Sequence, residues 1–72
     1  MKMISVDSSA VLKVGYDKGS LFVQFVGGEW YEYPQVPESV FDQFLCAPSK
    51  GTFVNKSVKP HYQGFPCLSP EV

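Results

Sequence analysis

Residues 11–33 read VLKVGY-DKGS-LFVQFV-GG-EWYEY and hold three short apolar runs separated by residues that favour turns. Valine, leucine, phenylalanine and tyrosine dominate the runs 11–16, 21–26 and 29–33, as they do in β-strands. The connections consist of residues 17–20 and a pair of glycines, and these residue types tolerate the positive φ angles of tight turns. The stretch therefore predicts a three-stranded antiparallel β-meander.

Strand alternation divides the aromatic side chains of the third run between two faces. Tyr31 and Tyr33 share one face, and Trp30 and Glu32 share the other. We expect the two tyrosines to pack in the core. For Trp30 two alternatives stay open: it closes the end of the core, or it stands exposed for contact with a partner.

The next segment has the pattern of an amphipathic helix. Pro37 suits the first helical position, Pro48 ends the helix, and about residues 37–47 are expected to be helical. A stripe of apolar residues at helical spacing would cover the apolar face of the meander, as a small sheet requires. Its members are Val40, Phe41, Phe44, Leu45 and Ala47.

The remaining residues are less regular. Residues 53–58 place two valines four apart before Pro60, which predicts a short C-terminal helical turn or one further strand. Residues 63–72 hold two prolines and a glycine and read as a loose C-terminal tail, with Phe65 and Leu68 available to dock it. The expected fold is α+β, with a single domain over residues 1–62.

The composition argues against catalysis and against a membrane protein. The sequence has one histidine, His61, and no paired carboxylates, phosphate loop, nucleophile motif or metal-ligand spacing. We therefore expect no enzyme activity, no catalytic residues, no metal and no cofactor. The two cysteines form no recognisable motif, and no apolar run approaches the roughly 18 residues that span a membrane. We expect a cytoplasmic monomer, in the host cytoplasm if the chain is viral.

Charge distribution bears on RNA binding. Three lysines, Lys50, Lys56 and Lys59, lie near Phe53 and Tyr62, so ammonium groups could meet phosphates while a ring stacks on a base. The formal net charge is -1 and the chain has no arginine, the side chain best suited to bidentate phosphate recognition. RNA binding is therefore the alternative function, and a solvated lysine face over core aromatics is preferred to it.

Protein binding fits the residues better. Trp30 flanked by Glu29 and Glu32 would form an aromatic and acidic contact surface, because tryptophan is a favoured binding anchor. A strand edge, either 11–16 or 29–33, could also accept a strand from another chain, with Lys13 preventing uncontrolled pairing.

The sequence resembles the KTSC domain family over about residues 6–62. The resemblance rests on Tyr31-Glu32-Tyr33, Ser49-Lys50-Gly51 and a series of residues in matching order: Val6, Ser8-Ser9, Val11, Gly15-Tyr16-Asp17, Leu21, Val23, Phe25, Gly28, Val36-Pro37, Phe53, Asn55, Val58 and Tyr62. This small bacterial domain stands alone or ends some lysyl-tRNA synthetases, which implies an association with nucleic-acid machinery. RNA binding has been suggested for it.

These observations together predict a non-enzymatic binding module that regulates or adapts a transcription or translation machine through protein contact. A phage-type modulator of host RNA polymerase is one such regulator that would fit the small size and the charge.

Overall fold

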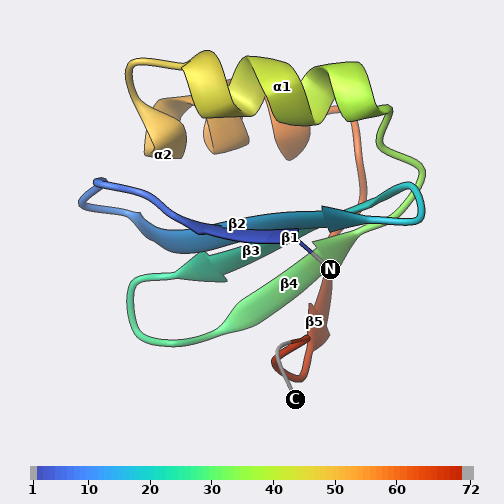
Figure 1. Ribbon diagram of the computed structural model, residues 1–72, viewed down its shortest axis with the longest axis horizontal. Helices are drawn as coiled ribbons and strands as arrows, with labels where there is room; N and C mark the ends of the chain where they lie inside the picture. Colours follow the sequence, from blue (N-terminus) through green and yellow to red (C-terminus); the bar gives the residue numbers. More distant parts are fainter. Residues whose placement is uncertain (1, 71–72) are drawn as a thin grey trace.

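The computed structural model describes residues 2–70 and contains one five-stranded antiparallel sheet beneath a layer of helices. Figure 1 shows both helices above one face of the sheet, which we call the inner face, and the other face free of helices, which we call the outer face. The elements follow in this order: β1 (Lys2–Ser5), β2 (Val11–Asp17), β3 (Ser20–Phe25), β4 (Trp30–Tyr33), α1 (Glu38–Cys46), α2 (Lys50–Phe53), the π-helical turn η1 (Val54–Val58) and β5 (Phe65–Cys67).

The α+β class and the central meander are confirmed, but the number of strands is not three. The strands lie in the order β1-β2-β3-β4-β5, with every neighbouring pair antiparallel. Strand β1 pairs with β2 over four residue pairs, and β5 pairs with β4 over three. Both added strands are short, so neither carries a readable alternation pattern of its own, and each becomes a strand because a neighbouring edge supplies hydrogen-bonding partners.

This arrangement corrects two expectations. Residues 11–16 and 29–33 are not sheet edges, because β1 covers the first and β5 covers the second. Residues 63–70 are not loose throughout, since Phe65–Cys67 form β5, while residues 71 and 72 lie outside the described part. Gly64 contributes to this docking, because a Cβ at that position would lie 2.5 Å from Cε1 of Tyr33.

The turns use the residues that the sequence singled out. The β2–β3 connection places Lys18 and Gly19 at φ angles of 51° and 82°, between the paired residues Asp17 and Ser20. Positive φ at both central positions is the conformation that matches the twist of two-residue hairpins. Gly27 and Gly28 also have positive φ, which explains the second turn.

A β-bulge between Val11 and Lys13 shapes the inner face. Val11 pairs with Phe25 and Lys13 pairs with Gln24, so β2 holds one residue more than β3 over this interval. Val11 and Val14 are three residues apart and would point to opposite faces of a regular strand. With the bulge between them both have 0% exposure and join the same core.

The core lies between the inner face and the helix layer. The predicted helix is confirmed to within a residue at each end, and Phe41 and Phe44 of its stripe are buried. The predicted turn at residues 53–58 is helical and buries Val54 and Val58. The whole core cluster comprises Val11, Val14, Leu21, Val23, Tyr33, Val36, Phe41, Phe44, Val54 and Val58.

Helix α2 begins at a capped residue and approaches the sheet closely. The Ser49 hydroxyl accepts a hydrogen bond from the backbone N–H of Thr52 at 3.3 Å, as an N-cap residue does. A Cβ at Gly51 would lie 2.9 Å from the Cβ of Ala10, which is short for a rigid methyl group. Gly51 therefore sets how near α2 comes to the β1–β2 connection.

We expect Gly51→Ala to reduce the free energy of unfolding, because overpacking costs about 1–3 kcal/mol and exceeds the roughly 1 kcal/mol that alanine gains over glycine in a helix. In an Ala10→Gly background the clash is absent, so the same substitution should stabilise the protein. Urea unfolding of the wild type, the two single variants and the double variant measures this coupling. Equal effects of Gly51→Ala in both backgrounds would show that the two residues do not restrain each other.

Candidate functional site

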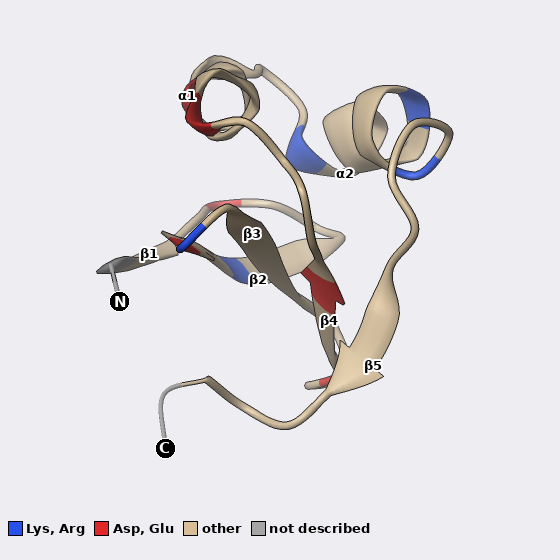
Figure 2. Ribbon diagram, turned by 90° about the vertical axis from the view of Figure 1, so that its right-hand side faces the viewer, with Lys and Arg blue, Asp and Glu red and all other residues tan. Residues whose placement is uncertain are grey.

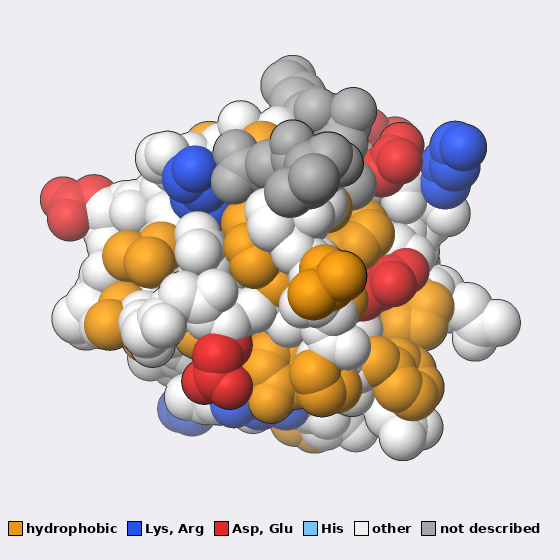
Figure 3. Space-filling view, turned by 90° about the horizontal axis from the view of Figure 1, so that it is seen from below, with side chains coloured by type: hydrophobic (Ala, Val, Ile, Leu, Met, Phe, Trp, Pro, Cys, Tyr) orange, Lys and Arg blue, Asp and Glu red, His pale blue; other side chains and the backbone are white. Residues whose placement is uncertain are grey.

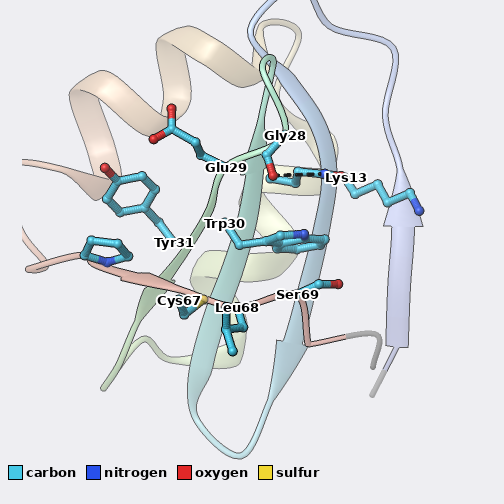
Figure 4. A pocket seen from close by; sticks show the side chains of 10 residues that line it. Lys13, Gly28, Glu29, Trp30, Tyr31, Cys67, Leu68 and Ser69 are labelled. Carbon is cyan, nitrogen blue, oxygen red and sulfur yellow. Dashed lines mark hydrogen bonds between the residues drawn. The ribbon is translucent and has the colours of Figure 1, made fainter.

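A groove runs across one end of the outer face. The register places Lys13, Gln24, Trp30 and Cys67 side by side on β2, β3, β4 and β5. The residues that follow β5 turn back over this row, and Leu68 and Ser69 form the other wall of a groove of about 570 Å³. Figure 4 shows Trp30 at its centre, between Lys13 and Leu68, while Tyr31 points to the other side of β4.

Trp30 takes neither of the two positions left open by the sequence. It is 5% exposed, so it is not a free-standing contact residue. It is also absent from the core cluster beneath the helices, because its strand position directs it to the outer face. Trp30 is buried because β5 and the residues after it lie beside its side chain. These residues were expected to form a loose tail.

The groove collects three of the four residues predicted for protein contact. Lys13, Glu29 and Trp30 line it, and Glu29 is exposed at its rim. Glu32 lies in the next row and does not line it. Its carboxylate accepts a 2.8 Å hydrogen bond from the Ser20 hydroxyl, so it joins β4 to β3.

The outer face also carries apolar side chains that were not predicted as contact residues. Phe65 is 48% exposed and Leu68 is 91% exposed, so neither docks the tail as expected. Phe22 lies beside Glu32 in the register, on the same face. In Figure 3 hydrophobic side chains gather across this face, with charged groups around them. The exposed face of an antiparallel sheet is ordinarily polar, which makes this surface a candidate contact site.

The lysines of the RNA-binding alternative do not form one surface. Lys50 donates hydrogen bonds from Nζ to the backbone oxygens of Leu45 at 3.0 Å and Ala47 at 2.6 Å, and so caps α1. Lys56 lines a small groove beside Phe53, and Lys59 lies over the ring of Phe25. In Figure 2 basic segments lie in the helix layer near α2 and also on β2, and acidic segments lie on both α1 and β4.

The aromatic members of that alternative are partly structural. Phe53 stacks on Phe44, with ring centroids 5.3 Å apart and an interplanar angle of 7°. Tyr62 is half-buried and packs against the core cluster. One face of the Phe53 ring is therefore covered by Phe44 and is not available to a base.

The two tyrosines of β4 differ in depth. Tyr33 is 3% exposed, which confirms it as a core residue, whereas Tyr31 is half-buried beside the core. Tyr31 meets Phe25 edge to face, with centroids 5.6 Å apart. Burial, and secondarily the nearby Tyr31, raises the pKa of Tyr33 above its usual value of 10.0.

Within residues 2–70 there is no helix that is both long and apolar enough to cross a membrane. The same part of the chain contains no group of three histidine, cysteine or acidic side chains placed to hold a metal ion.

Alkaline pH should destabilise the protein through Tyr33. Because the pKa of Tyr33 is higher in the folded state, the unfolded chain loses this proton first, and stability falls as pH rises above about 10. Tyr33→Phe should flatten the decline of melting temperature between about pH 9 and 11. An unchanged slope in Tyr33→Phe would contradict the assignment.

Removing the cap at the end of α1 should weaken the fold. Lys50→Met keeps the aliphatic stem but loses both hydrogen bonds, so we expect the free energy of unfolding to fall by about 1–2 kcal/mol. Lys56→Met changes an exposed lysine and should alter it by less than about 0.5 kcal/mol. Chemical denaturation of the two variants decides the matter, and equal stability would refute the capping role.

Comparison with known proteins agrees with this fold. The model of the KTSC domain family matches residues 7–62. A protein from Tsukamurella paurometabola is 46% identical over 63 residues, which cover 85% of this chain and 94% of the relative. A protein from Stutzerimonas stutzeri is 38% identical over 66 residues, covering 88% and 93%.

A solved structure has a similar fold over most of the chain. The crystal structure of a KTSC domain protein from Yersinia pestis superposes with a TM-score of 0.83 at 33% identity and covers 93% of this chain and 97% of its own. The resemblance seen in Tyr31-Glu32-Tyr33 and Ser49-Lys50-Gly51 is thus confirmed by an independent family match. The chain belongs to the KTSC domain family.

Proposed function

We propose that the chain is a non-enzymatic binding module that contacts another protein through the outer face of its sheet. The observation that carries this proposal is the exposed apolar pair Phe65 and Leu68 next to the groove of Trp30. Contiguous apolar surface of this kind marks interaction sites in small proteins.

The surface has the organisation of a protein contact. Leu68, 91% exposed, would gain about 1.5–3 kcal/mol if a partner covered it fully. Trp30 is already ordered and buried, so it supplies a rigid floor without loss of side-chain entropy on binding. Glu29 at the rim and Lys13 in the wall add the polar border that surrounds the apolar centre of most interfaces.

A component of the transcription or translation machinery is the partner we favour, because the family resemblance associates this domain with lysyl-tRNA synthetases. In this proposal the chain acts as an adaptor or regulator in the cytoplasm and binds as a monomer. A phage-type modulator of host RNA polymerase stays a prediction within that class.

RNA binding is the weaker proposal. Lys50 is engaged with backbone carbonyls of α1, and Lys56 and Lys59 line different grooves. Each phosphate contact adds to the affinity for RNA through counterion release. Lysines that lie on different surfaces make few such contacts with one RNA strand, so the expected affinity is low.

A pull-down from bacterial lysate tests the proposed surface. Leu68→Glu places a charge in the apolar centre at a position that is almost fully exposed, so the fold should persist while capture of the partner falls at least about tenfold. Val26→Glu is the matched control, since Val26 is a 53% exposed apolar residue in the β3–β4 turn outside the groove.

The outcomes separate the binding classes. Capture that survives nuclease and is lost only in Leu68→Glu supports protein contact at the outer face. Equal capture by Leu68→Glu and Val26→Glu would remove this face as the site. If capture disappears on nuclease treatment and in Lys56→Met and Lys59→Met, RNA binding replaces the proposal. Recovery of a differently tagged copy of the chain would contradict the expected monomer.

A further inference from the structure

A second pocket lies on the inner side of β4, across the strand from Trp30. It measures about 290 Å³ and is lined by Phe25, Glu29, Tyr31, Tyr33 and Lys59. The tyrosines and Phe25 reach it because alternate residues of β3 and β4 face the helix layer. Lys59, the residue that follows η1, also lines the pocket. The pocket shares Glu29 and Tyr31 with the outer groove, but its other lining residues are its own.

Two tyrosines, Tyr31 and Tyr33, are among the residues that line this pocket. Tyr33 is 3% exposed, and its neighbour Tyr31 lies near enough to disfavour ionisation of its hydroxyl. A neutral tyrosine hydroxyl can donate one hydrogen bond, so both tyrosines that line the pocket can donate to an anion bound there. Hydrogen bonds from such donors to an anion are stronger than those to a neutral acceptor.

Lys59 brings a positive charge to the same space. Its Nζ lies 5.3 Å from the centroid of the Phe25 ring, a distance at which the ring face attracts a cation. The backbone N–H of Lys59 donates to the carbonyl oxygen of Val54 at 2.8 Å, the bond that closes the wide π-helical turn. This bond holds the base of the side chain in place, while its exposed ammonium group can turn from the ring to a ligand.

The walls between these polar groups are aromatic. Phe25 and Tyr31 stand edge to face, with an interplanar angle of 77°, and form a corner against which a flat apolar body can pack. The volume of about 290 Å³ is near the lower end of small-molecule sites, at about 300 Å³. A ligand with a single ring and an anionic group fits within this volume, since a cavity of about 150 Å³ already holds benzene.

Glu29 at the rim allows an opposite interpretation, because aromatic rings with a carboxylate also bind organic cations. The position of Lys59 decides against it. The chain's own ammonium group lies over Phe25, so a second cation would meet repulsion there. An anion would instead draw this ammonium group off the ring, which frees the Phe25 face for the ligand's ring.

We propose that this pocket binds a small molecule whose anionic group, a carboxylate or a phosphate, meets Lys59 and the hydroxyls of Tyr31 and Tyr33 while its apolar ring packs against Phe25. The two anionic groups share one chemistry, and the probes below distinguish them. This site lies across β4 from the protein contact proposed for the outer face and shares Glu29 and Tyr31 with its groove.

Amide chemical-shift titrations of the full chain provide the test. Benzoate and phenyl phosphate are the anionic probes, benzylamine is the cationic probe and benzyl alcohol the neutral one. We expect saturable shifts at residues 25, 31, 33 and 59 with at least one anionic probe, and binding at least about tenfold weaker for benzylamine and benzyl alcohol. The tighter of benzoate and phenyl phosphate identifies the preferred group.

Four variants assign the site. Lys59→Met should weaken binding of the anionic probe about tenfold or more, Lys59→Arg should largely retain it, and Lys56→Met, a lysine outside this pocket, should leave it unchanged. Glu29→Gln should strengthen binding severalfold, because it removes the repelling carboxylate.

Several results would overturn the proposal. They are the absence of saturable shifts with both anionic probes, tighter binding of benzylamine, or equal losses in Lys59→Met and Lys56→Met. Lys59→Met could disturb the amide spectrum as a whole, and in that case Lys59→Arg and Glu29→Gln decide. If Lys59→Arg loses binding while Glu29→Gln binds the anionic probe with unchanged affinity, a charge-based site is contradicted. Leu68→Glu should bind the anionic probe as the wild type does, so failure here is distinguishable from failure of the outer-face contact.

Discussion

The pairing of β4 with β3 is the constraint on which both surfaces of this protein depend. Leu21 faces Tyr33 and Gln24 faces Trp30 across this pair. That register sends Tyr33 into the core under the helices and Trp30 into the opposite face. A slip of one residue would exchange the two, placing the indole among the core valines and the phenols on the outer face. The groove and the inner pocket are therefore two consequences of one alignment.

Several of the residues that carry the family resemblance have structural roles. Ser49 caps α2, Lys50 caps α1, and Gly51 permits the approach of α2 to Ala10. The hydroxyl of Tyr16 donates a 2.5 Å hydrogen bond to the carbonyl oxygen of Val36 and so ties β2 to the segment before α1. These roles are structural, whereas Phe25, Tyr31 and Tyr33, which also carry the resemblance, line the inner pocket.

Sequence reasoning succeeded where a local rule governs the structure. Gly19, Gly27 and Gly28 adopt the positive φ angles that marked the turns, and the apolar stripe around Phe41 and Phe44 identified α1. It failed where a segment is ordered by its neighbours. Strands β1 and β5 are too short to show an alternation pattern. The position of Trp30 was predicted without the residues after β5 that lie over it. Lys50 was predicted to be available to bind RNA, although its ammonium group donates hydrogen bonds to backbone carbonyls at the end of α1. Glu29 and Trp30 could still be grouped because they are adjacent in the chain, whereas Lys13 was predicted to protect a strand edge and the sheet register brings it to the same row as Trp30.

By itself the sequence determined the α+β class, the meander, the helix that covers it and the family, because alternation, turn residues and helical spacing act between residues near in the chain. Only the tertiary structure decided that the sheet has five strands, that Trp30 is buried on the outer face and that Phe65 and Leu68 remain exposed there. The same holds for the meeting of Lys59 with Tyr31 and Tyr33. The physical reason is that the burial of a side chain and the identity of its neighbours depend on pairing between segments far apart in the chain. No local sequence pattern specifies the register of that pairing.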